Sequence, residues 1–276
     1  MIPILNIRSA KQMDMGLKNK TALVTGSTRG IGKAIAFELA REGVHVLING
    51  RNNDDVERTV AEIQAAFPET GPRNATADLV DSRQREALFA NFPHVDILVN
   101  SMGIYEIMSY DDVDDAVWEK YFRTNFLAAN DLTKFYLPSM LSREYGRIIF
   151  IASEEAVMPS GQMPQYGVTK SMLLSLSKSL SKLTRGAEVT VNTILPGPTL
   201  SENVQQIIES VYSNEKMTFE AKEKDFMTKN LPHSEIGRFI RPVEIGRLTA
   251  FICSPMASAF KGAPIRIDGG MVPTIF

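Results

Sequence analysis

The chain has 276 residues, of which 44% are hydrophobic and 22% charged, and its formal net charge is −2 at pH 7. This length can bury a core without disulfides or metals, and the composition is that of an ordinary globular protein. The charge gives no basic footprint for nucleic acid, the single cysteine excludes a disulfide framework, and no apolar run reaches the roughly 18 residues of a membrane span. A reducing compartment, hence the cytoplasm, fits best.

Short apolar runs alternate with helix-like segments along the chain. The runs are continuous, as in buried parallel strands, whereas the segments between them carry apolar residues three or four positions apart. The pattern predicts one doubly wound α/β domain of the Rossmann type, with about seven parallel strands and helices on both faces. The expected strands are 21–25, 44–48, 74–77, 95–99, 147–152, 189–195 and 265–267, and the main expected helices are 31–39, 56–67, 118–132, 166–183 and 242–253.

Two stretches stand apart from this alternation. Residues 1–14 are expected to be a flexible leader, so that the domain covers residues 15–276. Residues 200–235 are charged, helical in pattern and longer than a simple connection. We expect this stretch to cover a substrate; the alternatives are a permanently docked helix pair or an oligomer contact.

A glycine-rich turn joins the first expected strand to the first expected helix. Glycines let a backbone approach a pyrophosphate, and the free N–H groups of a helix start attract its charge. A glycine pattern alone indicates no more than a tight turn, but its place in an α/β sheet predicts a dinucleotide site. The residues expected to contact the cofactor here are Gly26, Ser27, Thr28, Arg29, Gly30, Ile31 and Gly32.

The end of the second expected strand indicates which dinucleotide binds. An NAD site usually carries an acid there for the ribose hydroxyls, but this chain has Ile48-Asn49-Gly50-Arg51. A guanidinium can bind a 2′-phosphate that an acid would repel, so NADP(H) is the expected cofactor. Arg29 could reach the same phosphate. The alternatives are that both arginines are solvated and that the protein is NAD-linked.

Three side chains predict carbonyl chemistry. Ser153 follows an expected strand, and Tyr166 and Lys170 are four residues apart on one face of an expected helix. Carbonyl reduction needs a proton donor, a group that tunes it and a group that positions the substrate oxygen. Tyr166, Lys170 and Ser153 can fill these roles in that order, with the ammonium expected to lower the pKa of the phenol.

Taken together, these motifs resemble the short-chain dehydrogenase/reductase family, in its ordinary reductase-like branch, over about residues 17–272. The 3-oxoacyl-carrier-protein reductases are the nearer analogy. The matching motifs, in order, are Thr25–Gly32, Asp78-Leu79, Asn100-Ser101-Met102-Gly103, Asn125, Ser153, Tyr166 with Lys170, Pro196-Gly197 and Asp268-Gly269-Gly270. Met102 departs from the family's alanine, which puts the ribose contact, but not the activity, in question.

The resemblance implies further roles. Asn125 would complete a catalytic four with Ser153, Tyr166 and Lys170, and Lys170 would also bind the nicotinamide ribose. A homotetramer built through the helices before Ser153 and around Tyr166 is common in the family. The remaining implied cofactor contacts are Asp78 and Leu79 at the adenine, Asn100 and Gly103 near the adenosine ribose, Tyr166 and Lys170, and Pro196, Gly197 and Thr199 at the nicotinamide.

The sequence thus predicts an NADP(H)-dependent oxidoreductase acting on a small ketone or secondary alcohol, with no metal and with neither nucleic acid nor membrane as partner. A non-catalytic dinucleotide sensor is the alternative from another class. Two acids, Glu154 and Glu155, directly follow Ser153. If one of these acids faces the pocket, it would disfavour anionic substrates. If both face solvent, they would have no such effect on substrate choice.

Overall fold

The computed structural model describes residues 14–275, so the expected leader, residues 1–14, lies outside the described residues except for Asp14. The described chain forms a seven-stranded sheet in which all pairs are parallel, in the order β3-β2-β1-β4-β5-β6-β7. The predicted doubly wound α/β fold is confirmed. The strands are β1 (Thr21–Val24), β2 (His45–Ile48), β3 (Arg73–Asn74), β4 (Ile97–Asn100), β5 (Tyr145–Ile151), β6 (Glu188–Pro196) and β7 (Pro264–Ile267).

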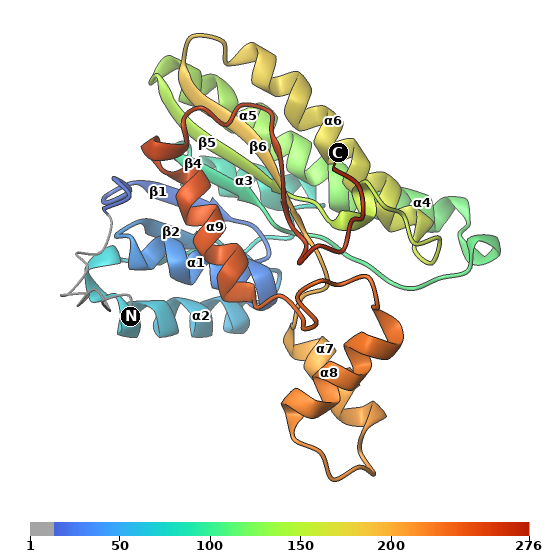
Figure 1. Ribbon diagram of the computed structural model, residues 1–276. Helices are drawn as coiled ribbons and strands as arrows, with labels where there is room; N and C mark the ends of the chain where they lie inside the picture. The colour runs from blue at the N-terminus through green and yellow to red at the C-terminus, as the bar shows by residue number, and fades with distance from the viewer. Residues whose placement is uncertain (1–13, 276) are drawn as a thin grey trace, which may run out of the picture.

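Helices cover both faces of the sheet (Figure 1). One apolar cluster joins the sheet to α1, α2 and α9, and a second joins it to α3, α5 and α6. Gly246 of α9 lies so close to α1 that a Cβ there would stand 2.8 Å from the carbonyl oxygen of Ala34. The helices are α1 (Gly30–Arg41), α2 (Asn53–Ala66), α3 (Ser82–Asn91), α4 (Asp115–Tyr121), α5 (Ala128–Ser142), α6 (Pro164–Leu183), α7 (Glu202–Val211), α8 (Phe219–Asn230) and α9 (Pro242–Cys253).

The strand order reverses between β1 and β4. From β1 the chain builds outward through β2 to β3, then returns to β4 and builds the other way to β7. In such sheets the loops at the carboxyl ends of the two central strands separate and leave a crevice for a ligand. This switch point is where the glycine-rich turn after β1 and residues 101–103 after β4 meet.

One expected helix, residues 118–132, is not regular. A π-helical segment, Phe122–Leu127, separates α4 from α5. A π turn accommodates an extra residue and often lies at a functional site. Here it carries the buried Asn125. The apolar spacing predicted the helix but gave no sign of the wider turn.

The arm formed by α7 and α8 extends away from the sheet (Figure 1). It has a small core of its own, made of Ile208, Tyr212, Met227 and Phe239. Two ion pairs support its base: Arg241 with Glu223, and Arg238 with Glu244. The predicted helical character of residues 200–235 is confirmed, and the arm is a small packed unit and not a loose loop.

Between residues 14 and 275 no helix has the length and apolarity that crossing a membrane requires. Over the same range, no three His, Cys, Asp or Glu side chains gather in a way that could hold a metal ion. Cys253 is fully buried, and this burial raises its pKa to about 12, so it is a small apolar core residue.

Candidate active site at the carboxyl ends of the strands

The glycine-rich turn after β1 is shaped by close backbone contacts. Gly26 has a φ of +62°, and a Cβ there would stand 3.1 Å from the Cα of Met102. A Cβ on Gly32 would lie 2.3 Å from the carbonyl oxygen of Gly26. The turn therefore excludes side chains at both positions, and it leaves backbone N–H groups at the start of α1. This arrangement fits a dinucleotide pyrophosphate.

Thr25 fixes the segment after β4 to this turn. Its Oγ1 accepts hydrogen bonds from the N–H groups of Ser101 and Met102, each at 2.9 Å. The side chain of Met102 packs against the apolar cluster on the α3, α5 and α6 side. The residue that departs from the family's alanine thus has its bulk accommodated by the core.

The end of β2 lies directly against the glycine-rich turn. A Cβ on Gly50 would meet Thr28 Cγ2 at 2.7 Å, so Gly50 permits this approach. Arg51 and Arg29, each next to one of these two residues, are both exposed, and neither guanidinium has an ion pair within residues 14–275. The structure therefore brings the two arginines to one edge of the site, where no acid from β2 competes.

Residues near the expected adenine site are held by local hydrogen bonds. The N–H of Asp78 donates to Gln84 Oε1 at 2.8 Å, and Leu79 is buried. Asn100 is buried at the end of β4, where its Nδ2 donates to Thr133 Oγ1 at 3.3 Å. Its Oδ1 is buried without a hydrogen-bond partner in the described chain. A buried acceptor of this kind fits a hydroxyl-bearing ligand.

The catalytic candidates meet at the end of β5. Ser153 follows the strand, and Tyr166 and Lys170 come from α6, with Lys170 Nζ 5.4 Å from the centre of the Tyr166 ring. The hydroxyl of Ser153 lies near the Tyr166 phenol and acts to lower the pKa of that phenol. Lys170 Nζ donates to the carbonyl oxygen of Ile151 at 2.9 Å. The structure thus brings together the three residues that the sequence singled out.

Asn125 faces the same group from the π turn. Its Nδ2 donates to Ile104 O at 3.0 Å and to Thr169 Oγ1 at 3.1 Å, and its Oδ1 accepts from Ile104 N at 2.8 Å. A Cβ on Gly103 would lie 3.1 Å from Lys170 Nζ and 3.4 Å from Asn125 Oδ1. Gly103 therefore forms a wall of the same space, and any larger residue there would press on both polar groups.

Burial shifts the pKa values of Tyr166 and Lys170, both on α6, in opposite directions. Burial raises the pKa of Tyr166, the hydrogen bond with Ser153 opposes the rise, and the negative charge of Glu154 adds to it. Burial lowers the pKa of Lys170 to about 8. The net shift of the Tyr166 pKa is therefore upward, with burial as its largest cause, whereas the sequence led us to expect a lowering by Lys170. The phenol is protonated at neutral pH.

The expected nicotinamide residues follow β6. Gly197 packs on the chain after β7, where a Cβ would stand 2.7 Å from the carbonyl oxygen of Asp268. Pro196 is buried, and Thr199 Oγ1 donates to the carbonyl oxygen of Gly197 at 2.8 Å. These residues share the carboxyl edge of the sheet with Ser153, since β5 and β6 are neighbours.

Sequence reasoning missed two residues that hold this edge together. Asn49 donates from Nδ2 to Ala75 O at 2.9 Å and to Ala77 O at 3.2 Å, and its Oδ1 accepts from Gly26 N at 3.3 Å. The second is Thr25, which the sequence marked only as the first residue of the Thr25–Gly32 motif and not as the acceptor for Ser101 and Met102. A polar residue at the end of an otherwise apolar run was the available signal in both cases.

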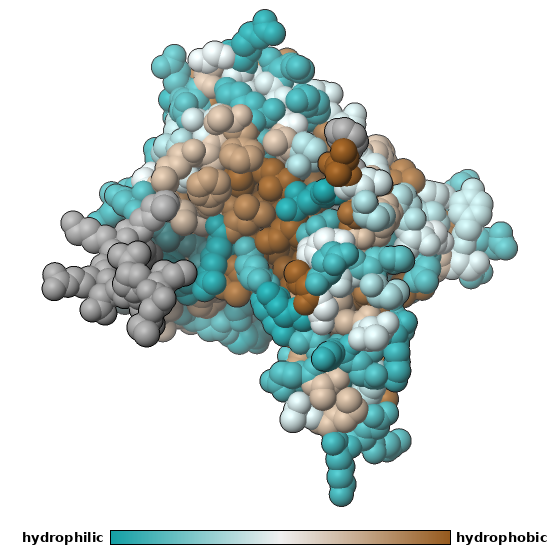
Figure 2. All heavy atoms as spheres, viewed as in Figure 1, coloured by the Kyte–Doolittle hydropathy of each residue, from teal (hydrophilic) through white to brown (hydrophobic). Residues whose placement is uncertain are grey.

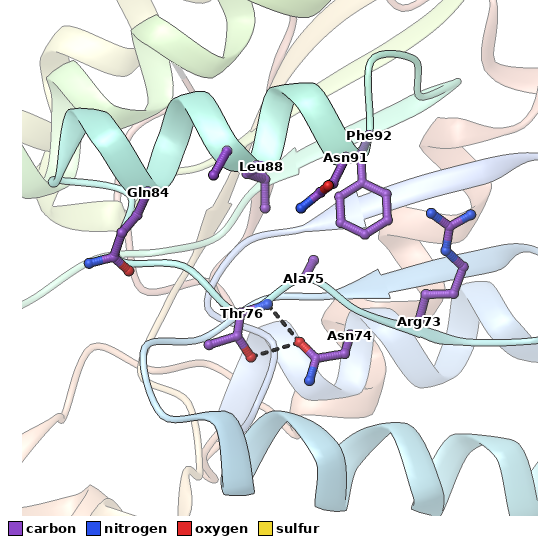
Figure 3. A pocket seen from close by; sticks show the side chains of 9 residues that line it. Arg73, Asn74, Ala75, Thr76, Gln84, Leu88, Asn91 and Phe92 are labelled. Atoms are coloured by element: carbon purple, nitrogen blue, oxygen red, sulfur yellow. Dashed lines mark hydrogen bonds between the residues drawn. The ribbon is translucent and has the colours of Figure 1, made fainter.

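A separate pocket of about 460 Å³ lies between β3 and α3 (Figure 3). Arg73, Asn74, Gln84 and Phe92 are among its lining residues, and the Arg73 guanidinium stacks over the Phe92 ring at 4.6 Å. No predicted catalytic or cofactor residue lines it. This pocket is therefore distinct from the candidate active site.

The family model described as short chain dehydrogenase matches residues 20–211. The chain is 46% identical over 264 residues to the uncharacterised oxidoreductase YvaG of Bacillus subtilis (strain 168), covering 96% of this chain and 100% of the relative. This chain belongs to the short-chain dehydrogenase/reductase family. The family assignment from the sequence motifs is confirmed, and the chain is an oxidoreductase whose fold binds a nicotinamide dinucleotide.

Two further proteins, a dehydrogenase and a reductase, are similar to this chain over most of its length. D-beta-hydroxybutyrate dehydrogenase of Cupriavidus necator is 32% identical over 260 residues, covering 93% of this chain and 99% of the relative. The crystal structure of L-sorbose reductase from Gluconobacter frateurii, complexed with NADPH and L-sorbose, superposes with a TM-score of 0.86 at 30% identity, covering 95% of this chain and 100% of that chain.

Proposed function

We propose that this protein is an NADP(H)-dependent oxidoreductase that transfers a hydride between the nicotinamide and a ketone or secondary alcohol, with Tyr166 as the general acid/base. The observation that carries the proposal is the meeting of Ser153, Tyr166 and Lys170 at the carboxyl edge of the sheet, beside the glycine-rich turn. L-sorbose reductase, a structural neighbour of the same family, is complexed with NADPH and a ketose.

The preference for NADP(H) rests on the edge formed by the end of β2 and the glycine-rich turn. Arg51 and Arg29 both lie there with exposed guanidinium groups. A guanidinium binds a phosphate through charge-assisted hydrogen bonds, whereas a carboxylate at the end of β2 would repel it. We therefore assign the two arginines to the 2′-phosphate of the cofactor.

The rest of the dinucleotide would follow the carboxyl edge of the sheet toward Ser153. The turn from Gly26 to Gly32 would hold the pyrophosphate, and Lys170 would bind the nicotinamide ribose. The other residues proposed to hold the cofactor are Asp78 and Leu79 at the adenine, Asn100 and Gly103 near the adenosine ribose, Tyr166, and Pro196, Gly197 and Thr199 at the nicotinamide.

The bound dinucleotide supplies or accepts the hydride. In reduction, Tyr166 donates its proton to the alkoxide oxygen, and its raised pKa keeps the phenol in the protonated form that a donor requires. Ser153 donates a hydrogen bond to the same oxygen and stabilises its developing charge. Lys170 would hold a positive charge near the phenol and substrate oxygens. Asn125 holds the neighbouring backbone in place through its two hydrogen bonds with Ile104.

A screen of ketones and alcohols with both cofactors tests this function. The panel should include neutral hydroxylated ketones such as L-sorbose, simple ketones and carboxylate-bearing ketones. We expect NADPH consumption with at least one ketone and its loss in Tyr166→Phe. Consumption that is equal in Tyr166→Phe, or a protein that binds NADPH without turning over any ketone or alcohol, would contradict the proposal.

We further propose that residues 200–235 cover the substrate. The carboxylate of Glu202, at the start of α7, reaches to 4.0 Å from the position that a Cβ on Gly30 would take, so the arm begins beside the glycine-rich turn. Exposed apolar side chains on α7, Ile207 and Val211, are available for a closing contact. The arm's own core allows it to move as one body.

Apolar surface on two faces supports a homo-oligomer, which we propose to be a tetramer. Brown and tan atoms gather over the face that carries α9 and the C-terminal stretch (Figure 2). Met163, just before α6, and Val168 and Met172 of α6 line a largely apolar hollow of about 470 Å³. Sedimentation of the full chain would show the mass of the assembly. We also place the protein in the cytoplasm, which suits its single buried thiol.

A further inference from the structure

The two acids that follow Ser153 have different surroundings. Glu155 is buried, and its Oε2 accepts a hydrogen bond from the N–H of Ser160 at 3.0 Å. Its backbone carbonyl packs against Gly167, where a Cβ would stand 3.1 Å from that oxygen. Glu154 is partly buried, and its Oε2 lies 2.8 Å from Ser153 Oγ. Only the Glu154 carboxyl therefore contacts the serine that faces Tyr166.

The hydrogen bonds of Ser153 limit what its hydroxyl can do. A serine hydroxyl has one proton to donate and two lone pairs with which to accept. Ser153 Oγ already accepts from the N–H of Glu155 at 3.2 Å. If Glu154 is a carboxylate, the contact with Ser153 uses the only serine proton. If Glu154 is protonated, it can donate to the second lone pair of Oγ, and the serine proton is free for the Tyr166 phenol or, once substrate is bound, for the substrate oxygen.

Resting on the proposed function, we propose that Glu154 is a positioning residue that acts through Ser153. With its carboxyl protonated, Glu154 donates to Ser153 Oγ and leaves the serine proton to bind the substrate oxygen. With its carboxyl ionised, Glu154 takes that proton and withdraws the hydrogen bond from the substrate. The protonation of one neighbouring acid thereby decides whether Ser153 can stabilise the alkoxide.

The surroundings of Glu154 place this change near neutral pH. Burial raises the pKa of Glu154 to about 7, the hydrogen bond from Ser153 opposes the rise, and the negative charges of Glu155 and Asp268 add to it. From α6, the side chains that face this group are the phenol of Tyr166 and, behind it, the ammonium of Lys170. The acid is therefore protonated below about pH 7 and ionised above it.

The pH profile of ketone reduction separates this proposal from a merely structural role. In the unmodified protein kcat/KM should fall as the pH rises through about 7. In Glu154→Gln the amide does not titrate and can donate to Ser153 Oγ from Nε2 at every pH, so the decline should move up toward the pKa of Lys170, about 8. Glu155→Gln is the matched control, since its carboxyl does not contact Ser153: it should keep a decline, moved only to lower pH because the negative charge of Glu155 contributes to the raised pKa of Glu154. A Glu154→Gln profile identical to that of the unmodified protein would overturn the proposal.

A second measurement requires no turnover. Carbon NMR of protein labelled at glutamate carboxyls should show one group titrating near 7, absent in Glu154→Gln. Ser153→Ala removes the hydrogen bond that favours the carboxylate, so the pKa of this group should rise. An unmoved pKa in Ser153→Ala overturns the proposal even if a substrate is known. If no ketone is reduced, the proposed function fails, while this titration still decides the role of Glu154.

Discussion

Lys170 Nζ donates a hydrogen bond to the carbonyl oxygen of Ile151, the last residue of β5, at 2.9 Å. Ser153 lies two residues further along the chain. The contact therefore fixes the ammonium on α6 relative to the serine that follows the strand. It also places the Lys170 ammonium in a buried position that disfavours its charge, and this burial lowers the free energy of unfolding while the lysine is charged.

Lys170→Met should be more stable than the unmodified protein at neutral pH. Burial lowers the folded-state pKa of Lys170 to about 8, against 10.5 when it is exposed. Below pH 8 the lysine is charged in both states and the folded protein bears the full cost of burying that charge. Between about 8 and 10.5 the folded state loses the proton first, so the cost fades as pH rises. Urea unfolding should show a stability gain in Lys170→Met that shrinks from pH 7 to pH 10, while NADPH binding and turnover both weaken. A gain that does not change with pH would contradict the pKa shift.

Tyr166→Phe should abolish most turnover while sparing the cofactor. The substitution removes the hydroxyl and keeps the ring, whose centre lies 6.0 Å from that of Tyr105. Loss of a general acid lowers kcat by roughly 10²–10⁴. Steady-state kinetics measures this fall in kcat. Fluorescence titration of the variant with NADPH should give a dissociation constant close to that of the unmodified protein. Near-normal turnover would mean that another group delivers the proton.

Arg51→Ala should reduce the preference for NADPH over NADH. A charge-assisted contact with the 2′-phosphate contributes roughly 1.5–3 kcal/mol, which corresponds to about a ten- to hundredfold change in affinity. Arg29→Ala should reduce the same preference, while Lys134→Ala, which removes an exposed charge from α5, should leave it unchanged. Equal affinities of the unmodified protein for the two cofactors would refute the assignment of the phosphate site.

Glu154→Gln should improve the use of carboxylate-bearing ketones relative to neutral ones. Above pH 7 the acid beside Ser153 is ionised and repels a second carboxylate near the reacting carbon. The variant should raise kcat/KM for an anionic ketone about tenfold at pH 8 relative to a neutral analogue, as expected for a like-charge contact near a protein surface. An unchanged ratio of the two substrates would show that the acid does not face them.

The arm of residues 200–235 should exchange its amide hydrogens quickly in the free protein and slowly with NADP(H) and a substrate analogue. Local opening draws on elements with few contacts to the main core, and α7 and α8 pack largely on each other. Helix α9, which packs along α1, is the internal control and should be protected throughout. Strong protection of the arm in the free protein, unchanged by ligand, would instead indicate a permanently docked element.

The positions of the strands along the chain and their parallel type could be predicted from the sequence because buried parallel strands are continuous apolar runs. The residues at their carboxyl ends could be predicted for the same reason, since parallel strands bring these ends to one edge. Residues 74–77 were expected to be a strand, but β3 is limited to Arg73 and Asn74. Past Asn74, the backbone carbonyls of Ala75 and Ala77 accept from the Asn49 side chain. A tertiary contact of this kind has no counterpart in local periodicity.

The chemistry of the site was less predictable than its location. Tyr166 and Lys170 share a helix face, which predicted their proximity, but the direction of the tyrosine pKa depends on how deeply the phenol is buried. Glu154 and Glu155 are the same residue type and adjacent in the sequence. The turn that follows Ser153 points their side chains to different partners, Glu154 to Ser153 and Glu155 to the backbone of Ser160. The π turn at Asn125 likewise depends on packing against Ile104 and Thr169.

The arm formed by α7 and α8 has an apolar core separate from the two cores that flank the sheet. Ile208, Tyr212, Met227 and Phe239 stabilise one another without help from the sheet. Changes on the exposed face of α7 can therefore accumulate without disturbing the glycine-rich turn or the residues around Tyr166. If residues 200–235 cover the substrate as we propose, duplicated copies of such a chain can acquire new substrates through this arm while keeping the residues around Tyr166 unchanged. Under that proposal, substitutions on the arm would change substrate choice at little cost to folding of the sheet.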